Sequence, residues 1–314
     1  MPTDPFEGIL NRDLVRVVAL PITEVASPLL VELVNHATWA LARCCSTKPT
    51  IEDDNLAPMS LYRHVIEMGD GVEVLVSQSC AVPAIPLIRS GFEALLSLRY
   101  ILEGDYSRRS LSWLARHGRE RLHGYERLDP ATARGKQLEG IKVHDTVAGK
   151  IAFPSAEVAR QGQARMRRIL SRPAMHEIEE EVRRLKKEKG NEPRWYGLFG
   201  GPSNLRELAR RLDSEVQYEF LYQHWSGTVH ATGFERFIQK GTRRGGQSAV
   251  TRLRDSEELQ QVAFYAAHQL LTATRIMLER FREGDEDFRG WYLREVRERY
   301  LWLVGKPGSD ESMP

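Results

Sequence analysis

Cysteine is scarce in this sequence, and the common catalytic motifs are absent from it. Only three of the 314 residues are cysteines: Cys44, Cys45 and Cys80. Because the number is odd and two of them are adjacent, the pattern argues against a disulfide framework and favours reduced cytosolic thiols. The chain also lacks a P-loop, a GxGxxG fingerprint and a GxSxG nucleophile elbow, which argues against the enzyme classes built on those motifs.

Spacings that suit a metal site are also missing. His117 and His123 are six residues apart, as are His224 and His230, so neither pair shares one face of a helix. His176 opens an HExxE segment that lacks the second histidine of the zinc motif HExxH. We therefore expect no metal and no cofactor. The formal net charge of +2 by itself predicts no particular partner.

No targeting or membrane segment is evident in the sequence. The first eight residues are acidic and lack the apolar run of a signal peptide. The most apolar stretch is 81–102, and Arg89, Glu93 and Arg99 interrupt it. We expect a buried helix of a soluble core there, a cytoplasmic protein and no membrane partner.

Apolar residues recur at helical spacing along most of the chain, whereas strand-like alternation is scarce. Ser27-Pro28 predicts the start of the first helix, and 48–58 is expected to be a loop. Ser214 and Gln217 predict a capping box at the start of a helix that runs to about residue 231. The other helices are expected at about 59–79, 84–103, 107–128, 203–212, 256–277 and 288–303.

The fold class predicted from these segments is all-α, a bundle of long helices. We expect a single helical domain over 1–305, with a signature core at about 60–128 and 194–235, and a disordered tail at 306–314. A charged helical hairpin is expected as an insertion at about 130–192. Within it, the segment 160–194 holds eleven Lys and Arg against six Glu. That excess could meet phosphates, although a solvated hairpin is the favoured interpretation.

One polar constellation is shared between two of the predicted helices. Arg89 and Glu93 are four residues apart on the helix at 84–103. The helix from 214 carries a ladder of polar side chains at four-residue intervals: Tyr218, Tyr222, Ser226 and His230. If these helices pack together, the two sets converge. Because an unpaired buried charge is very unfavourable, the Arg–Glu pair must be satisfied internally or face a cleft.

These two segments resemble the signature helices of an uncharacterised bacterial family, domain of unknown function 5677. The family pattern is Arg-Ser-x-x-Glu, followed much later by Tyr-x3-Tyr-x3-Ser-x3-His. The chain has Arg89-Ser90-x-x-Glu93 and the ladder from Tyr218 to His230, and Trp195-Tyr196 and the segment 206–209 are also similar. The resemblance spans roughly residues 60 to 235. It implies a bacterial helical protein and conveys no reaction.

A looser resemblance is to the HEPN superfamily of helical bundles, many of which are RNases of toxin and phage-defence systems. Their active sites pair an arginine with a histidine in an R-x4–6-H motif. His230 has no arginine at that spacing. Arg116 and His123 fit the motif but lie outside the signature helices. The resemblance therefore rests on the predicted helical bundle and on Arg89, which would act from a different helix than His230.

This second resemblance implies metal-independent RNA cleavage by the polar constellation. His230 would be the general acid or base, because imidazole titrates near neutrality. Arg89 would stabilise the charge that develops on the phosphorane. Glu93 would orient Arg89 or His230, and Ser226 or Tyr222 would complete the hydrogen bonding.

Two functions of different classes stay open at this point. The leading hypothesis is a toxin-type or phage-defence effector with RNase activity, for which RNA is the partner. The alternative is a non-catalytic binding or sensor module, in which the same polar residues only lock the helix register. A homodimer and an unidentified protein partner are compatible with either function.

Overall fold

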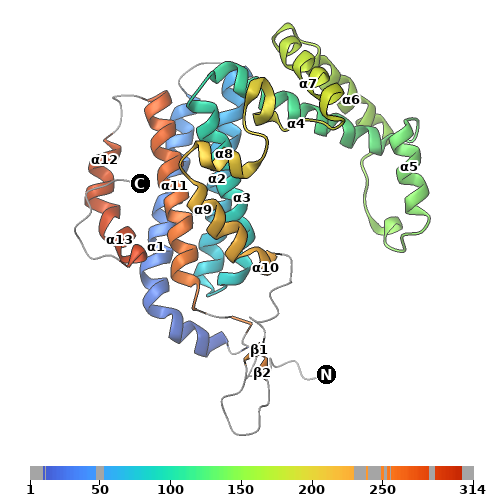
Figure 1. The fold of residues 1–314 in the computed structure, drawn as a ribbon. Coiled ribbons are helices and arrows are strands. Elements are labelled where there is room, and N and C mark those ends of the chain that lie inside the picture. The colour runs from blue at the N-terminus through green and yellow to red at the C-terminus, as the bar shows by residue number, and fades with distance from the viewer. Residues whose placement is uncertain are drawn as a thin grey trace. The chain divides into compact units, whose positions relative to one another are not determined.

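The computed structural model describes residues 10, 12–46, 53–229, 238–239, 249–250, 253–254, 256–282 and 287–305, and all structural statements concern these residues. They are helical almost throughout (Figure 1). The exception is the antiparallel pairing of β1 (Ile238–Gln239) with β2 (Ala249–Val250). The all-α prediction is thus confirmed. The predicted disordered tail at 306–314 lies outside the described residues.

The chain divides into two compact units. The first comprises residues 1–51, 58–102 and 209–314, and the second comprises 52–57 and 103–208. The sequence analysis places a single domain over 1–305, with an insertion at about 130–192. The main segment of the second unit starts earlier than this predicted insertion. It begins at residue 103, directly after the helix that carries Arg89 and Glu93.

Four long helices form the bundle of the first unit: α1 (Arg12–Cys45), α2 (Asp53–Ser77), α3 (Ala81–Leu102) and α11 (Leu259–Phe281). The hydroxyl of the fully buried Tyr62 on α2 lies 3.0 Å from the carbonyl oxygen of Ala37 on α1 and 2.9 Å from Thr274 Oγ1 on α11. Gln269 of α11 donates its amide to the carbonyl oxygen of Ile88 on α3 at 3.0 Å. Buried polar groups are therefore satisfied between helices, which fixes the packing register.

Smaller helices complete the first unit. They are α9 (Glu215–Glu219), the π-helical turn η4 (Phe220–His224), α10 (Ser226–Val229), α12 (Phe288–Trp291), the π-helical turn η6 (Tyr292–Val296) and α13 (Arg297–Val304). α13 packs against α11 and α1, and α10 packs against α3. The single helix predicted from residue 214 is therefore interrupted by a π-helical turn within its described part.

Two predicted helix starts are wrong. α1 begins by Arg12 and includes Pro28, because its apolar stripe continues upstream through the buried Val15 and Ala19. Ser27 does not cap a helix, since its hydroxyl donates to Glu73 at 2.6 Å. α2 begins at Asp53, within the loop predicted at 48–58. In both cases the burial of apolar side chains outweighs the local preference of proline for a helix start.

The predicted capping box at Ser214 is also absent. Its hydroxyl oxygen accepts a hydrogen bond from Arg99 Nη1 at 2.7 Å and lies 3.1 Å from the carbonyl oxygen of Leu212. The side chain makes no hydrogen bond to the start of α9. Ser214 thus anchors α3 to the chain before α9.

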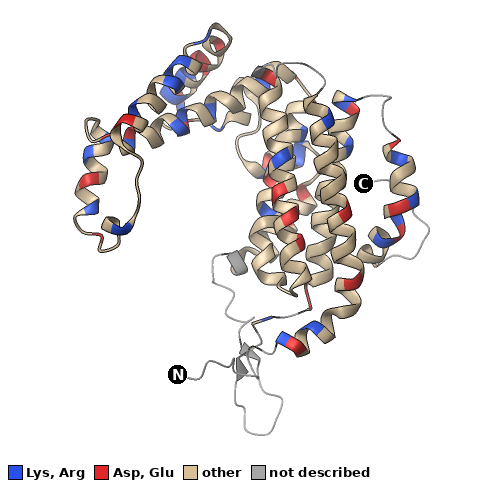
Figure 2. Cartoon of the chain, turned by 180° about the vertical axis from the view of Figure 1, so that it is seen from behind, with Lys and Arg blue, Asp and Glu red and all other residues tan. Residues whose placement is uncertain are grey.

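The second unit is built on α4 (Tyr106–Leu128). Against it pack α5 (Ala133–Lys142), α6 (Ala156–Leu170) and α7 (His176–Lys189), together with the turn η3 (Trp195–Gly200). The core residues are Ala115, Met175, Ile178, Val182, Leu185 and Leu198. α6 and α7 form the predicted charged hairpin, with the expected break before Pro173. Lys and Arg residues recur along this unit, with acidic residues among them (Figure 2). α8 (Leu205–Arg211) crosses back to the first unit.

Two helices, α1 and α3, are long and apolar enough to cross a bilayer by length and composition alone. The apolar window is 56% buried in α3 and 28% buried in α1. The apolar face of α3 is therefore largely used by packing within the protein.

Candidate functional site

Arg89 lies on the side of α3 that faces η4. Its guanidinium carbon is 4.0 Å from the ring centroid of Tyr222. Its Nη1 atom is buried and has no hydrogen-bond partner. No carboxylate of the described chain lies within ion-pair distance of Arg89. A cation that is packed on an aromatic ring and has an unused donor is a ready site for an oxyanion.

Glu93, one turn later on α3, completes this contact. It accepts a short hydrogen bond from the hydroxyl of Tyr222. Burial, and then the Glu93 carboxylate, raise the pKa of Tyr222 far above its ordinary value of 10. Tyr222 therefore stays protonated at neutral pH and acts as a donor. Glu93 itself is exposed, so the pair lies at the protein surface.

An aromatic stack supports the arginine. The ring of Tyr218 stacks on that of Tyr222, with centroids 4.7 Å apart and an interplanar angle of 13°. The segment is held in the core by Trp225, which is fully buried and makes edge contacts with Phe220 and Tyr265. Arg89 thus lies over a stack of two tyrosine rings, and the buried Trp225 holds the segment that carries them.

The structure brings together three of the five predicted site residues: Arg89, Glu93 and Tyr222. Ser226 is half-buried at the start of α10, which packs against α3. His230 lies outside the described residues. The premise that both charges of the Arg–Glu pair are buried does not hold for Glu93, which is exposed, whereas Arg89 is half-buried over the Tyr222 ring.

One polar contact beside this site was missed by the sequence analysis. His64 Nε2 on α2 lies 2.8 Å from the hydroxyl of Ser90, the residue after Arg89. Both side chains are half-buried. His64 is 26 residues from Ser90 and belongs to no periodic polar set, so the only signal was Ser90 itself in the Arg-Ser-x-x-Glu segment.

Two other histidines of the first unit are packed as neutral rings. Burial lowers the pKa of His268 to about 4, aided by Arg99 and Arg275, and its Nδ1 lies 3.0 Å from the hydroxyl of Tyr300. Burial likewise lowers the pKa of His36 to about 4, and its ring stacks 3.7 Å from that of Trp291. These rings are structural.

The second unit offers no arginine–histidine centre of the R-x4–6-H type. Arg116 is held by Glu120 at 2.8 Å and by Glu192 at 3.1 Å, so its charge is used within the unit. Within the described ranges, no group of three or more His, Cys, Asp or Glu side chains could hold a metal ion. The polar site on α3 is therefore the stronger candidate.

Comparison with known proteins identifies a family. The model of a family of unknown function, DUF5677, matches residues 55–246, which includes the Arg-Ser-x-x-Glu segment and the ladder from Tyr218 to His230. No curated protein and no solved structure matches the chain. The looser resemblance to HEPN proteins is not shown by these comparisons and stays a prediction. Because the matched residues make up more than half of the sequence, the chain belongs to the family of unknown function DUF5677.

Proposed function

We propose that this chain is a cytoplasmic effector of the toxin or phage-defence type, which cleaves RNA without a metal ion. The site would consist of Arg89, Glu93, Tyr222, Ser226 and His230. The observation that carries the proposal is the Arg89 guanidinium, which is held over Tyr222 with a buried donor unused. Guanidinium groups are suited to phosphate because their donors are planar and permanently charged.

The two arginines of α3 differ in how their donors are used. Arg99 is also half-buried, but it donates to the carbonyl oxygen of Leu212 and to the hydroxyl of Ser214, each at 2.7 Å. Arg89 instead contacts the ring of Tyr222, and its Nη1 atom has no hydrogen-bond partner. A structural role accounts for the hydrogen bonds of Arg99. It does not account for the Arg89 donor that has no partner.

The chemistry of this class divides among the proposed residues as follows. A general base removes the proton of a ribose 2′-hydroxyl, whose oxygen attacks phosphorus as the bond to the 5′ oxygen breaks. A general acid returns a proton to the leaving 5′ oxygen, and the product carries a 2′,3′-cyclic phosphate. His230 serves as the general base or the general acid, and Arg89 binds the phosphate oxygens as their charge rises. Glu93 and Tyr222 hold Arg89 in place.

The rival function is a non-catalytic binding or sensor module. The same contacts favour it in one respect, because the cation–π pair and the Tyr222–Glu93 hydrogen bond join α3 to η4. In that case the cluster would only fix the register of these elements.

The test uses the purified full chain and an end-labelled RNA, in the presence of a chelator. Wild type should cleave the RNA and leave 2′,3′-cyclic phosphate ends, whereas Arg89→Gln and His230→Ala should lose about 100-fold or more in rate. Arg63→Gln is the matched control, since Arg63 is an exposed arginine of α2 paired with Glu67.

A cellular experiment complements the assay. Wild type and His230→Ala are expressed in a bacterial host, and growth and total RNA integrity are followed together. Growth arrest with fragmented RNA for wild type alone supports the proposal. Intact RNA with both proteins, in cells and in the purified assay, contradicts it and leaves the binding module in place.

A further inference from the structure

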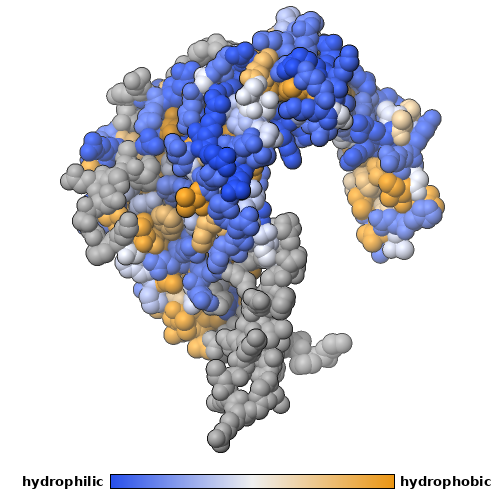
Figure 3. Space-filling model, in the orientation of Figure 1, coloured by the Kyte–Doolittle hydropathy of each residue, from blue (hydrophilic) through white to orange (hydrophobic). Residues whose placement is uncertain are grey.

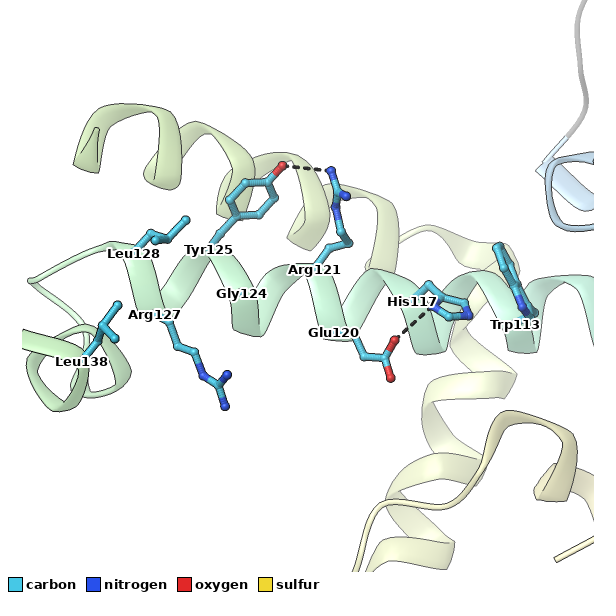
Figure 4. Close-up of a pocket in the computed structure, with 9 residues that line it drawn as sticks. All are labelled: Trp113, His117, Glu120, Arg121, Gly124, Tyr125, Arg127, Leu128 and Leu138. Carbon is cyan, nitrogen blue, oxygen red and sulfur yellow. Dashed lines mark hydrogen bonds and ion pairs between the residues drawn. The ribbon is translucent and has the colours of Figure 1, made fainter. Parts of the chain in front are cut away.

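The second unit contains a groove that plays no part in the proposed site. It has a volume of about 830 Å³ and runs along α4 (Figure 4). Eight of its nine lining residues come from α4, and the ninth, Leu138, comes from α5. We propose that this groove binds single-stranded nucleic acid, with bases stacked on its aromatic rings and phosphates on its arginines. The proposal does not depend on RNA cleavage at Arg89.

Aromatic rings lie toward both ends of the groove. Trp113 packs against the ring of His117, with centroids 4.1 Å apart. Tyr125 lies twelve residues further on, which places it about 18 Å along the helix axis at 1.5 Å per residue. The Tyr125 ring is fixed from behind by Gly162 of α6, where a Cβ atom would lie 2.6 Å from it. Fixed aromatic rings are the platforms on which bases stack, whatever the sequence.

Two arginines of the groove have no carboxylate partner among the described residues. Arg127 is exposed, and Arg121 is exposed beside Tyr125, with its guanidinium carbon 5.8 Å from the ring centroid and Nη2 3.4 Å from the hydroxyl. Other arginines of α4 are used internally, since Arg119 binds Glu179 and Glu192. Among the arginines of α4, those left over for a ligand are thus the two that line the groove.

The charge of the surrounding unit suits a polyanion. Residues 103–208 contain 22 Lys and Arg against 15 Asp and Glu. Figure 3 shows that the surface of this unit is mostly hydrophilic, with apolar side chains gathered in limited areas. The one acid in the groove, Glu120, is paired with Arg116 and lies 3.0 Å from His117 Nδ1. An extended site that combines aromatic rings with arginines that have no carboxylate partner fits a strand with stacked bases and phosphates.

The experiment measures fluorescence anisotropy of labelled single strands of about 12 nucleotides, at about 50 and 200 mM salt, with the full chain. A DNA strand is the primary probe, because it has no 2′-hydroxyl and resists the proposed cleavage chemistry. Binding of DNA therefore reports on the groove even if the proposed RNase function fails. A matched RNA strand tests whether the 2′-hydroxyl adds affinity.

Trp113→Leu should lose at least about fivefold in affinity, whereas Trp113→Phe should retain most of it, because a stacking ring remains. Arg121→Gln combined with Arg127→Gln should flatten the salt dependence by about 1.4 in log–log slope, or 0.7 for each lost phosphate contact. Lys187→Gln is the control: it removes one exposed charge of α7, outside the groove, and should change affinity less than twofold.

Three results would overturn the proposal. One is failure of the wild type to bind either strand at about 100 µM and low salt. Another is an equal loss for Lys187→Gln and Arg127→Gln, since binding would then reflect diffuse charge. The third is unchanged affinity of the Trp113→Leu and Arg127→Gln variants. Because Arg127 is exposed, its substitution keeps the test valid if Trp113→Leu folds poorly.

Discussion

The two arginines of α3 offer a direct test of whether the polar site is built for a ligand or for stability. Arg89 and Arg99 are ten residues apart on the same helix, and both are half-buried. Arg99→Gln removes two hydrogen bonds, to Leu212 and Ser214. Hydrogen bonds to a charged group contribute about 1.5–3 kcal/mol each when well formed, and partial exposure reduces this, so we expect a loss of about 2–3 kcal/mol.

Arg89→Gln removes the cation–π contact with Tyr222, which contributes about 1 kcal/mol at a half-exposed position. It also relieves a buried donor that has no partner. We therefore expect the free energy of unfolding to fall by about 1 kcal/mol or less. In a unit of this size, the two variants should differ by several degrees in melting temperature, since about 1 kcal/mol shifts Tm by about 2–4 °C.

The assay is urea unfolding of both variants, followed by circular dichroism and by tryptophan fluorescence, so that separate transitions of the two units are recognised. RNA cleavage is measured on the same samples. Loss of activity with near-normal stability for Arg89→Gln supports a ligand site. An Arg89→Gln variant that is as unstable as Arg99→Gln and cleaves RNA like the wild type would refute the reasoning.

Three further predictions concern the same unit. Tyr222→Phe keeps the ring under the arginine but removes the donor to Glu93, so unfolding studies should show a loss of about 1 kcal/mol and the cleavage assay a smaller defect than an arginine substitution. His268 has a folded pKa of about 4, below its ordinary 6.5, so the stability that its neutral form provides is complete above pH 6.5 and is lost as the pH falls towards 4. When the pH is lowered from 7 to 4.5, the free energy of unfolding measured in urea should therefore fall by about 2–3 kcal/mol less for His268→Gln than for the wild type. Gly91→Ala would place a Cβ atom against Gln269 Oε1, in a contact that a buried side chain cannot easily relieve, and should lower the free energy of unfolding by about 1–3 kcal/mol.

The glycine and histidine predictions have matched controls in the chain. Gly140→Ala lies in α5 with no atom near its would-be Cβ, and should raise stability by about 0.4–1 kcal/mol. His176→Gln makes the same substitution at an exposed histidine of α7. A Gly91→Ala protein as stable as wild type, or a His268→Gln protein with the wild-type pH profile, would contradict the packing described around α11.

The sequence predicts the helices well where apolar spacing is continuous, as in α3 and α4. Local signals, such as a proline or the spacing of a helix cap, predicted helix ends less reliably than the burial of apolar side chains explains them. Pro28 and Pro58 suggested helix boundaries but lie inside α1 and α2, because apolar side chains on both sides of each proline are buried. Ser214 had the spacing of a cap but bonds Arg99, a partner 115 residues away in the sequence.

Helical spacing predicts which site residues share a face of one helix, and it predicts no more of the site than that. A separation of four residues places Arg89 and Glu93 on one face, and likewise Tyr218 and Tyr222, and both pairs act together in the structure. The contact between the two pairs depends on how α3 packs against η4, which the spacing does not determine. The His64–Ser90 contact depends in the same way on the packing of α2 against α3 and so was missed.

The π-helical turn at Phe220–His224 means that the polar ladder is not a straight row. A π turn holds one residue more than the α-helical turn that it replaces, and each residue added or removed rotates the following side chains by about 100°. The direction of Ser226 relative to Tyr222 therefore depends on the number of residues in this turn as much as on residue type. Removal of one residue between Tyr222 and Ser226 would leave both of these side chains intact and yet rotate Ser226 by about 100° relative to Tyr222. Length variants of this short segment, rather than substitutions, are thus the sensitive probe of whether both halves serve one centre.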